Sequence, residues 1–580
     1  MPSGKREAKV ATLPLVGDPT QRNFNAAASL TSGLDQRFRG CQFVVVPDPQ
    51  KQTKNVYVEK RPGIESAGTI VPSRTGHAIS DNFALGPSAA DYFCCAIGTG
   101  TPSTDSVFQV RSSGSQGSMG ALTASTIVNR MSIGWFSNIP TILMTASTTP
   151  SIGQSDRSGW FSVASTGMLI GTFTADTVSG NPDLTNVSST SFLFIGQELS
   201  GTGITAGTRI QSISGTTVTM TANATANGSG VTVTRTGIAK IISTNFPTGQ
   251  GGPVGKMEEL NGRAFALMES SGAVYNSGLN EPWTWPASAF LAPRRYKGYG
   301  VTLQKYKTFL LVFTSSGVSF FYDNGNPSGS VLNEQQELAF PYGVNSGYPI
   351  EVDYQLPVSS VGDYVFWTTP DFNIGVWTLA GYEPKKISGV IEDRILAGSS
   401  TSSFARIQAY QQNGQTYLFC YNGTNQLLYH VESGMWSDPV FSLVPYIGNA
   451  PCTVGTVISG GTEGKFYRFS DQTPVYTDDG SAFTMTIQTD TWDGGTQDWK
   501  QIERIELIGD TQSSGTTTLQ ISGDDYANFT TIGSFDMTQP RKELFSGGWY
   551  QGSVAFKLTN SANTPFRAQA LRITYKTGLA

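Results

Sequence analysis

The chain is poor in charge and almost devoid of histidine. Of its 580 residues, 14% are Asp, Glu, Lys or Arg, and the net charge is −5. An ordinary soluble domain has about 25% charged residues. This shortage excludes a strongly basic nucleic-acid-binding protein and the Glu- and Lys-rich coiled coils and helical bundles. Disorder is also excluded, because the chain carries many large apolar side chains and little net charge.

Long apolar runs and patterned cysteines are missing as well. No run approaches the roughly 18 residues of a membrane-spanning helix, and residues 1–6 are charged with no apolar segment after them. We therefore expect neither a signal peptide nor a membrane span, and synthesis in a cytoplasm. The five cysteines lack metal-ligand spacing, which predicts buried free thiols. They are Cys41, Cys94, Cys95, Cys420 and Cys452.

The residues of common catalytic sites are also scarce. His77 and His430 have no Cys, Asp or Glu cluster at ligand spacing, so we expect no metal site. A Ser-His-Asp triad would need one of them, yet His430 reads as a cross-strand partner within a strand. The Gly-rich stretches open no helix and fit no phosphate-binding loop. We expect no enzymatic activity, no catalytic residue and no cofactor.

Two acidic stretches are interpreted as turns. Ser522–Phe529 resembles the Ser-x-Asp-x-Gly-x-x-Trp hairpin turn of sialidase propellers, with the Gly and Trp replaced. Asp524 and Asp525 can accept backbone N–H bonds there. Asp478–Gly480 lacks the ligand spacing of a calcium loop. The remaining Asp and Glu residues are scattered and nominate no pair for glycoside cleavage.

Basic residues form three small clusters, which we interpret mainly as solvated faces, with exposed strand ends or subunit contacts as alternatives. The clusters are Lys51, Lys54, Lys60 and Arg61; Arg294, Arg295 and Lys297; and Lys385 and Lys386.

The chain is rich in glycine, with 65 residues, and in short apolar runs bounded by Gly, Asn, Asp or Ser. This pattern predicts strands joined by hairpins. Several runs come as pairs, and the last four pairs begin roughly 45–55 residues apart, which is propeller spacing. The pairs are Asp91–Ala96 with Val107–Val110, Arg263–Met268 with Ala273–Tyr275, Phe309–Phe313 with Val318–Tyr322, Tyr364–Thr368 with Gly375–Leu379, and Thr416–Cys420 with Leu427–Val431. We predict an all-β chain with an irregular β-propeller of six or seven blades.

Two segments depart from this rhythm. In residues 166–236 aromatic residues stop after Phe194, and Thr, Ser, Gly and β-branched residues then dominate. The segment resembles a small β-module common in phage structural proteins. From about residue 482, six strands without the paired pattern predict an antiparallel sheet or sandwich. The predicted division is 1–165, an N-terminal arm and the first part of the propeller; 166–236, an inserted small β-domain; 237–481, the remainder of the propeller; and 482–580, the C-terminal sheet or sandwich.

Three stretches resemble the tail nozzle, or packaged-DNA stabilisation, proteins of short-tailed (podovirus-like) bacteriophages. Asn55–Ile64 is similar to the family's N-x-Y-x-E-x-R-P-G pattern. The central stretch comprises Gly362–Trp367, Gly375–Trp377, Glu383–Ser388, Ile391–Glu392, Ala409–Tyr410, Gly414–Phe419, Leu428–Tyr429 and Met435–Trp436. The third comprises Ile502–Leu507, Ser522–Asp525 and Arg541–Phe545. Two departures concern the subfamily: His430 stands where the family tends to have Asp, and the Ser522–Asp525 turn lacks its Gly.

This resemblance implies a structural virion protein of the short tail, assembled in the bacterial cytoplasm. The subunit would form a homo-oligomeric ring, with a hexamer as the expected size, below the portal and its head-to-tail adaptor. The ring would carry fibres, spikes, a plug or a needle, and it would retain genomic DNA and pass it during ejection without sequence-specific binding. A slightly acidic chain suits such a channel, because it would not grip phosphates.

Two other functions remain open from the sequence. A receptor-binding or glycan-binding tail propeller predicts a concave patch built from Trp283, Trp285 or Trp436, although the first two fit blade packing better. A propeller hydrolase such as a sialidase predicts an inward-facing cluster of Arg and carboxylates.

Overall fold

The computed structural model is built of antiparallel β-sheets. Its described part contains no α-helix and one 3₁₀ helix, η2 (Gln336–Leu338), and none of its helices has the length and apolar character needed to cross a membrane. The structure describes residues 7–16, 38–48, 53–69, 76–79, 92–98, 105–111, 116–123, 126–147, 157–163, 169–248, 251–326, 328–344, 357–369, 375–389, 406–421, 426–441, 445–452, 455–460, 465–469, 475–524 and 526–578.

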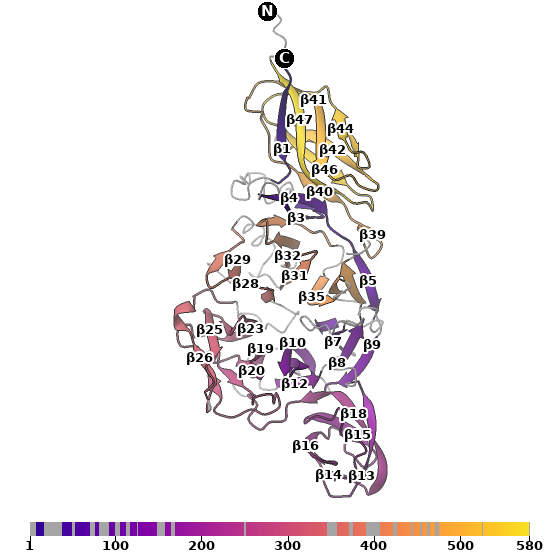
Figure 1. Ribbon diagram of the computed structural model, residues 1–580, viewed down its shortest axis with the longest axis vertical. Helices are drawn as coiled ribbons and strands as arrows, with labels where there is room; N and C mark the ends of the chain where they lie inside the picture. Colours follow the sequence, from indigo (N-terminus) through magenta and orange to yellow (C-terminus); the bar gives the residue numbers. More distant parts are fainter. Residues whose placement is uncertain are drawn as a thin grey trace, which may run out of the picture.

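The main body is a β-propeller, and the described residues form seven sheets, or blades, around its axis (Figure 1). In order from the inner strand outward, the blades are: blade 1, β6 (Gly76–Ile79), β7 (Tyr92–Gly98), β8 (Asp105–Arg111) and β9 (Gln116–Ala121); blade 2, β10 (Ile127–Phe136), β11 (Ile139–Ser147), β12 (Ser158–Val163) and β18 (Gly228–Lys240); blade 3, β19 (Pro253–Leu260), β20 (Arg263–Met268), β21 (Val274–Asn276) and β22 (Phe290–Leu291); blade 4, β23 (Gly300–Tyr306), β24 (Phe309–Thr314), β25 (Val318–Asp323) and β26 (Leu332–Glu334); blade 5, β27 (Val358–Val361), β28 (Tyr364–Thr369), β29 (Gly375–Ala380) and β30 (Pro384–Lys386); blade 6, β31 (Arg406–Gln412), β32 (Gln415–Tyr421), β33 (Gln426–His430) and β34 (Met435–Ser437); and blade 7, β35 (Pro445–Cys452), β36 (Gly455–Gly460), β37 (Lys465–Phe469) and β5 (Ile64–Thr69).

The ring of blades closes on itself. Each inner strand contacts the inner strand of the next blade, in the order β6, β10, β19, β23, β27, β31, β35 and back to β6. The outer strand of blade 7 comes from the N-terminal part of the chain, because β5 pairs with β37 with Glu65 opposite Arg468. Two short strands, β38 (Thr477–Asp478) and β39 (Ser481–Ala482), extend this sheet beyond β5.

The paired apolar runs of the sequence are the second and third strands of the blades. Where their side chains are described, most residues of these strands are buried between neighbouring blades; β24, for example, is buried from Leu310 to Thr314. Two-residue turns join inner strands to second strands. Asn261-Gly262 and Asn413-Gly414 both adopt positive φ, as the hairpin turns that match strand twist require.

The hydrophobic core of the propeller lies between blades. Each apolar cluster draws its side chains from two adjacent blades. Between blades 4 and 5, the ring of Trp367 stacks on Phe340 with centroids 5.5 Å apart, and that of Trp377 stacks on Tyr342 at 4.0 Å. Aromatic pairs of this kind stabilise a core beyond their buried area.

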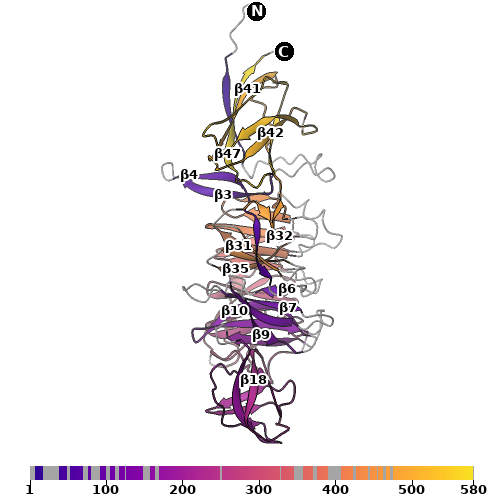
Figure 2. The same ribbon diagram turned by 90° about the vertical axis from the view of Figure 1, so that its right-hand side faces the viewer.

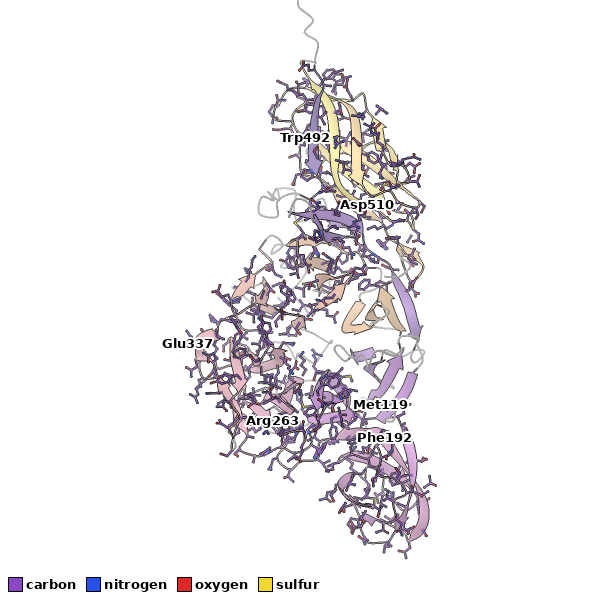
Figure 3. All side chains as sticks on the ribbon, viewed as in Figure 1. Met119, Phe192, Arg263, Glu337, Trp492 and Asp510 are labelled. Carbon is purple, nitrogen blue, oxygen red and sulfur yellow. The ribbon has the colours of Figure 1, made fainter. Side chains whose placement is uncertain are left out.

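A small β-domain, the module, is inserted into blade 2 between its third and fourth strands. Its strands are β13 (Gly171–Thr177), β14 (Asp183–Leu184), β15 (Gln197–Gly201), β16 (Ile210–Ser214), β17 (Thr217–Met220) and the first part of β18. It encloses its own apolar core, which includes Phe173, Leu199 and Val218. The module lies at one end of the molecule, with Phe192 close to the propeller (Figure 3).

The module and blade 2 share β18. Residues Val231–Arg235 of this strand pair with β13 inside the module, whereas Ala239 and Lys240 pair with β12 of the blade. The Arg209 guanidinium of the module lies 4.8 Å from the ring centre of Trp160 in β12. The junction is thus one continuous strand supported by a cation–π contact.

The molecule is flat and elongated when it is turned edge-on (Figure 2). A β-sandwich lies at the end of the molecule opposite the module (Figure 1). Its seven-stranded sheet contains β1 (Lys9–Pro14), β3 (Cys41–Asp48), β4 (Thr53–Lys60), β41 (Lys500–Gly509), β44 (Lys542–Phe545), β45 (Trp549–Tyr550) and β47 (Arg567–Thr577). Its five-stranded sheet contains β2 (Phe38–Arg39), β40 (Met485–Gln488), β42 (Thr516–Ser522), β43 (Thr530–Asp536) and β46 (Ala555–Asn560). One apolar cluster fills the space between the sheets, including Phe43, Ile505, Phe556 and Leu571.

Strands from both ends of the chain build this sandwich. β1 and β4 both pair with β47, and β2 pairs with β40. The first strands of the chain therefore belong to the sandwich, and the chain enters the propeller only at β5.

Deleting residues 166–236 and joining Ser165 to Gly237 through a short Gly-Ser linker should leave a folded propeller. The module has its own core, and the deletion keeps the buried Ile238, Ala239 and Ile241 of the blade. Circular dichroism and thermal unfolding of the two chains check this prediction.

The control is a deletion that continues through Ile241 and removes the outer strand of blade 2. It should unfold at a clearly lower temperature than the shorter deletion. Aggregation of the shorter deletion without a folded core would show that the module is part of the propeller.

Candidate functional site

The segment that connects sandwich and propeller is organised by one buried arginine, Arg61, whose side chain is 1% exposed. Its guanidinium forms a bidentate ion pair with Asp478, at 2.8 Å from Nη1 to Oδ1 and 2.5 Å from Nη2 to Oδ2. The remaining N–H groups donate to the carbonyls of Pro62, Pro439 and Val440. All five donors of the side chain are thereby used.

Two aromatic rings enclose this guanidinium. Its carbon lies 3.8 Å from the ring centre of Phe483 and 4.3 Å from that of Phe441. Phe441 follows blade 6, whereas Phe483 lies just before the sandwich strand β40. Arg61 therefore ties together the last blades and the sandwich through charge, hydrogen bonds and cation–π contacts.

The next residues are shaped by close backbone approach. A Cβ on Gly63 would lie 2.0 Å from the carbonyl oxygen of Thr477, so only glycine fits there. The Gly63 amide donates to the carbonyl of Val475 at 2.6 Å, and the Asp479 amide donates to that of Ile64 at 2.7 Å. The Arg61-Pro62-Gly63 sequence is thus the point where the segment that leads from the sandwich into the propeller contacts the segment that leads back to the sandwich.

Lys60 is buried next to Arg61. Its ammonium donates to the carbonyl of Ala562 at 2.6 Å and to Oδ1 of Asn560 at 3.3 Å, both in the sandwich. Burial, with the neighbouring Arg61 charge, lowers the pKa of Lys60 to about 8, against an opposing effect of Asp478. The cost of burying this ammonium is therefore only partly offset by its hydrogen bonds.

The free edge of β3 is capped by side chains of blade 6. The Val45 amide donates to Oε1 of Gln415 at 3.1 Å, Nε2 of Gln415 donates to the Val45 carbonyl at 3.4 Å, and the Tyr417 hydroxyl donates to the Phe43 carbonyl at 2.8 Å. These side chains occupy backbone groups that an edge strand would otherwise present to another chain.

His430 belongs to the same contact. It lies opposite Tyr417 in the sheet, so its interpretation as a cross-strand partner is confirmed. Its Nε2 lies 2.9 Å from Oε1 of Gln415 and 3.0 Å from Oε2 of Glu432, and Nδ1 lies 2.8 Å from Oγ of Ser433. Burial would raise the pKa of Glu432, but hydrogen bonds from His430 and the Thr416 amide hold that pKa below its usual value.

Charged pairs also lie within and between blades 2 to 4, and a propeller hydrolase predicts an inward-facing cluster of Arg and carboxylates. The first pair joins the residue before β12 to the residue after β20. Arg157 Nη1 lies 3.3 Å from Glu269 Oε2, and both side chains are buried. Gly251 and Gly252, both with positive φ, leave room for this pair, because a Cβ on either would lie 2.7 Å from one of its atoms.

The inner strand β19 carries two further pairs next to a bulge. Between Val254 and Glu258 the register shifts against β20. Lys256 Nζ lies 2.7 Å from Oε1 of Glu258, and Lys305 Nζ lies 3.0 Å from Oε2 of Glu259. Bulges re-aim side chains. Together with Arg157 and Glu269, these four residues are the charged groups on which the hydrolase alternative can be tested.

The residues singled out by sequence take varied positions. Cys41 and Cys420 are free and buried, and burial is the main cause that raises the pKa of each thiol. His77 and the other three cysteines lie in β6, β7 and β35, and their side chains are outside the described residues. In the described part of the chain, no group of three His, Cys, Asp or Glu residues could hold a metal ion.

Both acidic stretches form turns. The Asp524 carboxylate accepts from the Asn528 amide at 2.9 Å and from the Ser522 hydroxyl at 2.7 Å, and these hydrogen bonds hold the pKa of Asp524 below its usual value. Asp479-Gly480 turns between β38 and β39. The buried partnership of Asp478 with Arg61 was not foreseen, because 417 residues separate the two.

The interpretation of Lys60 and Arg61 as a solvated face is wrong. Each residue is 1% exposed, because the carbonyls and carboxylate that satisfy them come from distant parts of the chain. Lys51 and the side chain of Lys54 lie outside the described residues. The other five basic residues are exposed: Arg294, Arg295, Lys297, Lys385 and Lys386.

The tryptophans proposed for a sugar-binding patch are mainly core residues. Trp285 is 1% exposed, and its indole N–H donates to the Pro282 carbonyl at 2.9 Å. Trp436 is 4% exposed, and its N–H donates to the Ile387 carbonyl at 3.0 Å. The half-buried Trp283 contacts Phe161 of blade 2. The expectation that Trp283 and Trp285 pack between blades is therefore confirmed.

Comparison with known proteins finds likeness only at the level of solved structures. No family model matches the chain, and no curated protein matches it. An exo-β-1,3-galactanase from Phanerochaete chrysosporium, determined with galactose, is 12% identical, covers 89% of this chain and 100% of its own, and has a TM-score of 0.24. A Trypanosoma rangeli sialidase is 10% identical, with coverages of 93% and 94% and a TM-score of 0.27. An ancestral GH74 enzyme is 10% identical, covers 76% of both chains and has a TM-score of 0.26.

These matches correct one prediction from the sequence. The expectation of a chain without enzymatic activity is wrong as it stands, because the solved structures that it matches are glycoside hydrolases. At these identities and TM-scores, however, the likeness assigns no reaction, substrate or catalytic residue to this chain. The chain is a β-propeller protein with an inserted β-domain and a terminal β-sandwich.

Replacing Arg61 with Met should lower the free energy of unfolding by about 3–5 kcal/mol, because Asp478 would stay buried without its partner. Denaturant unfolding followed by tryptophan fluorescence measures this loss. Arg294→Met, at an exposed position, is the control and should stay within about 0.5 kcal/mol of the parent.

The double variant Arg61→Met/Asp478→Leu should be more stable than Arg61→Met alone, because it leaves no buried charge. If Arg61→Met matched the control, Arg61 would not hold sandwich and propeller together.

Lys60 gives the junction a dependence on pH. Its pKa is about 8 in the folded chain and about 10.5 when unfolded, so between these values the unfolded chain binds more protons. The free energy of unfolding should therefore rise with pH above about 8, relative to Lys60→Met, by less than about 1.4 kcal/mol per pH unit, the limit for one proton. Denaturant titrations of both chains between pH 7 and 10 test this. Parallel pH profiles would mean that Lys60 stays charged in the folded protein.

Proposed function

We propose that the chain is a structural subunit of the tail nozzle of a short-tailed bacteriophage. The subunits form a ring, with a hexamer as the expected size, below the portal and its adaptor. The ring extends the DNA exit channel, retains the packaged genome and passes it during ejection. Its other partners are the fibres, spikes, plug or needle of the tail.

The observation that carries this proposal is the position of the family-like stretch Asn55–Ile64. The stretch contains β4 and the buried Lys60 and Arg61, and Gly63 lies where only glycine fits. The residues through which the sequence resembles the nozzle family therefore join the sandwich to the closing strand of the propeller. They have a physical reason to be present in any subunit that combines these two domains.

The central stretch of the resemblance supports the same proposal. Trp367 and Trp436 lie in the cores between blades 4 and 5 and between blades 5 and 6. In the family-like stretch Ser522–Asp525, the Ser522 hydroxyl at the end of β42 donates to Asp524, and Asp525 lies outside the described residues. The flat, elongated form places one additional domain at each end of the propeller (Figure 2), as suits a subunit with neighbours above, below and beside it.

The native mass of the purified chain, alone and mixed with a portal–adaptor complex, tests the proposal. Rings of about six subunits of 62.0 kDa, or monomers that become rings on the complex, are expected. The chain without residues 166–236 is a useful second sample, because it separates assembly by the module from assembly by the propeller and sandwich.

Two results would replace the nozzle proposal. A monomer or trimer that ignores the complex and binds a glycan array would indicate a receptor-binding protein. Turnover of a fluorogenic glycoside that is lost in Glu258→Gln or Glu269→Gln, with folding unchanged, would indicate a propeller hydrolase.

A further inference from the structure

The side chain of Lys60 is buried beside a side-chain amide. In the described part of the chain, its ammonium donates to three neutral oxygens: the Ala562 carbonyl at 2.6 Å, Oδ1 of Asn560 at 3.3 Å and the Asn560 carbonyl at 3.5 Å. Lys60 and Asn560 are each 1% exposed. The Asp478 carboxylate, which favours the charged form of Lys60, is held at both oxygens by Arg61.

These surroundings favour the neutral amine of Lys60. Burial and the Arg61 charge lower the pKa of Lys60 to about 8, so part of the population is uncharged near neutral pH. The ring centre of Phe483 lies 4.9 Å from Nζ and that of Tyr476 lies 6.0 Å from it, so apolar surface borders the amine. A desolvated, uncharged lysine amine is a nucleophile.

The amide of Asn560 is held in one orientation. Its Nδ2 donates to Oγ1 of Thr564 at 3.4 Å and to Oγ1 of Thr517 at 3.5 Å, which leaves Oδ1 directed at Lys60. Lys60 ends β4 of the seven-stranded sheet, and Asn560 ends β46 of the five-stranded sheet. The two sheets thus hold an amine beside the carboxamide, and such fixed positioning replaces a bimolecular encounter.

We propose that Lys60 and Asn560 join in an isopeptide bond that the chain forms on its own. The neutral amine attacks Cγ of Asn560, and the bond from Cγ to Nδ2 breaks. One amine proton passes to the departing nitrogen, which leaves as ammonia, and a secondary amide between Nζ and Cγ remains. No oxidant or reductant is consumed. The Thr517 and Thr564 hydroxyls accept hydrogen bonds from the departing nitrogen and are therefore placed to relay the proton.

The bond connects the two sheets of the sandwich and encloses the propeller in one covalent loop. Lys60 and Asn560 are 500 positions apart, and the propeller strands from β5 to β37 lie between them in the sequence. A crosslink of this kind stabilises a fold mainly by restricting the unfolded chain. The inference does not depend on the ring assembly. The pH titration described above for Lys60 concerns the chain before this bond has formed.

Intact-mass spectrometry of the purified full chain, followed over days at several pH values, tests the inference. The parent should become lighter than its sequence by one ammonia molecule. Because only the neutral amine reacts, the rate should rise about tenfold for each pH unit below about 8 and level off above that pH. Peptide mapping should find the segment that contains Lys60 joined to the segment that contains Asn560.

Three variants and one matched lysine are the controls. Lys60→Met, Lys60→Arg and Asn560→Ala each remove one reacting group and should keep the full mass of their sequences. Lys500 is also a buried lysine, but its ammonium donates to three backbone carbonyls at 2.6–3.1 Å. Peptides that contain Lys500 should therefore stay unlinked in the same digest. The mapping uses the parent chain, so it does not require that any variant folds.

Two results would overturn the inference. One is a parent chain that keeps its full mass throughout the incubation. The other is a loss of ammonia that persists in Lys60→Met and gives no linked peptide. Such a loss would come from succinimide formation at an Asn-Gly sequence such as Asn261-Gly262, which also releases ammonia. Either result would leave the nozzle proposal unchanged.

Discussion

The pairing of β5 with β37 is the interaction on which the rest of the fold depends. It joins residue 64 to residue 469, so the strand that precedes blade 1 in the sequence completes the sheet of the last blade. Closing so long a loop costs conformational entropy, although the cost rises only slowly with length. The bidentate pair of Arg61 with Asp478 lies beside this closure. It adds directional contacts where the chain leaves the sandwich and where it returns.

The sequence predicted those parts of the fold whose signal is local. The second and third strands of the blades are buried on both faces, so runs such as Phe309–Phe313 are apolar throughout. The outer strands β22, β26 and β30 are short and partly exposed, and they leave no such pattern. The membership of β1 to β4 in the sandwich could not be predicted either, because their partners lie hundreds of residues away in the sequence.

The same distinction explains the errors about charge. Lys60 and Arg61 follow a strand and precede a proline, as solvated residues often do, and only the folded chain shows the carbonyls and carboxylate around them. Asp478 reads locally as part of an Asp-Gly turn, and the turn is present, but its carboxylate has a second role. A low content of charged residues therefore did not mean that charge is structurally unimportant. In the described residues, Arg61 and Asp478 form a buried pair between domains, and Arg157 and Glu269 form one between blades 2 and 3.

The expectation of a non-enzymatic chain had the weakest basis, because it was drawn from the absence of familiar motifs. A propeller brings residues from successive blades together at its axis, so a reactive group there needs no short sequence pattern. The pairs Arg157–Glu269 and Lys305–Glu259, each formed between two different blades, illustrate such an assembly of distant residues.

The continuous strand β18 has a mechanical consequence. Because one backbone passes from the module into the outer edge of blade 2, with hydrogen-bonded neighbours along both parts, the module has no flexible tether on that side. A force on the module would load the β12–β18 pairing in shear, where several bonds must break together. The module is thus rigidly coupled to the propeller, and a force on the module would first twist blade 2.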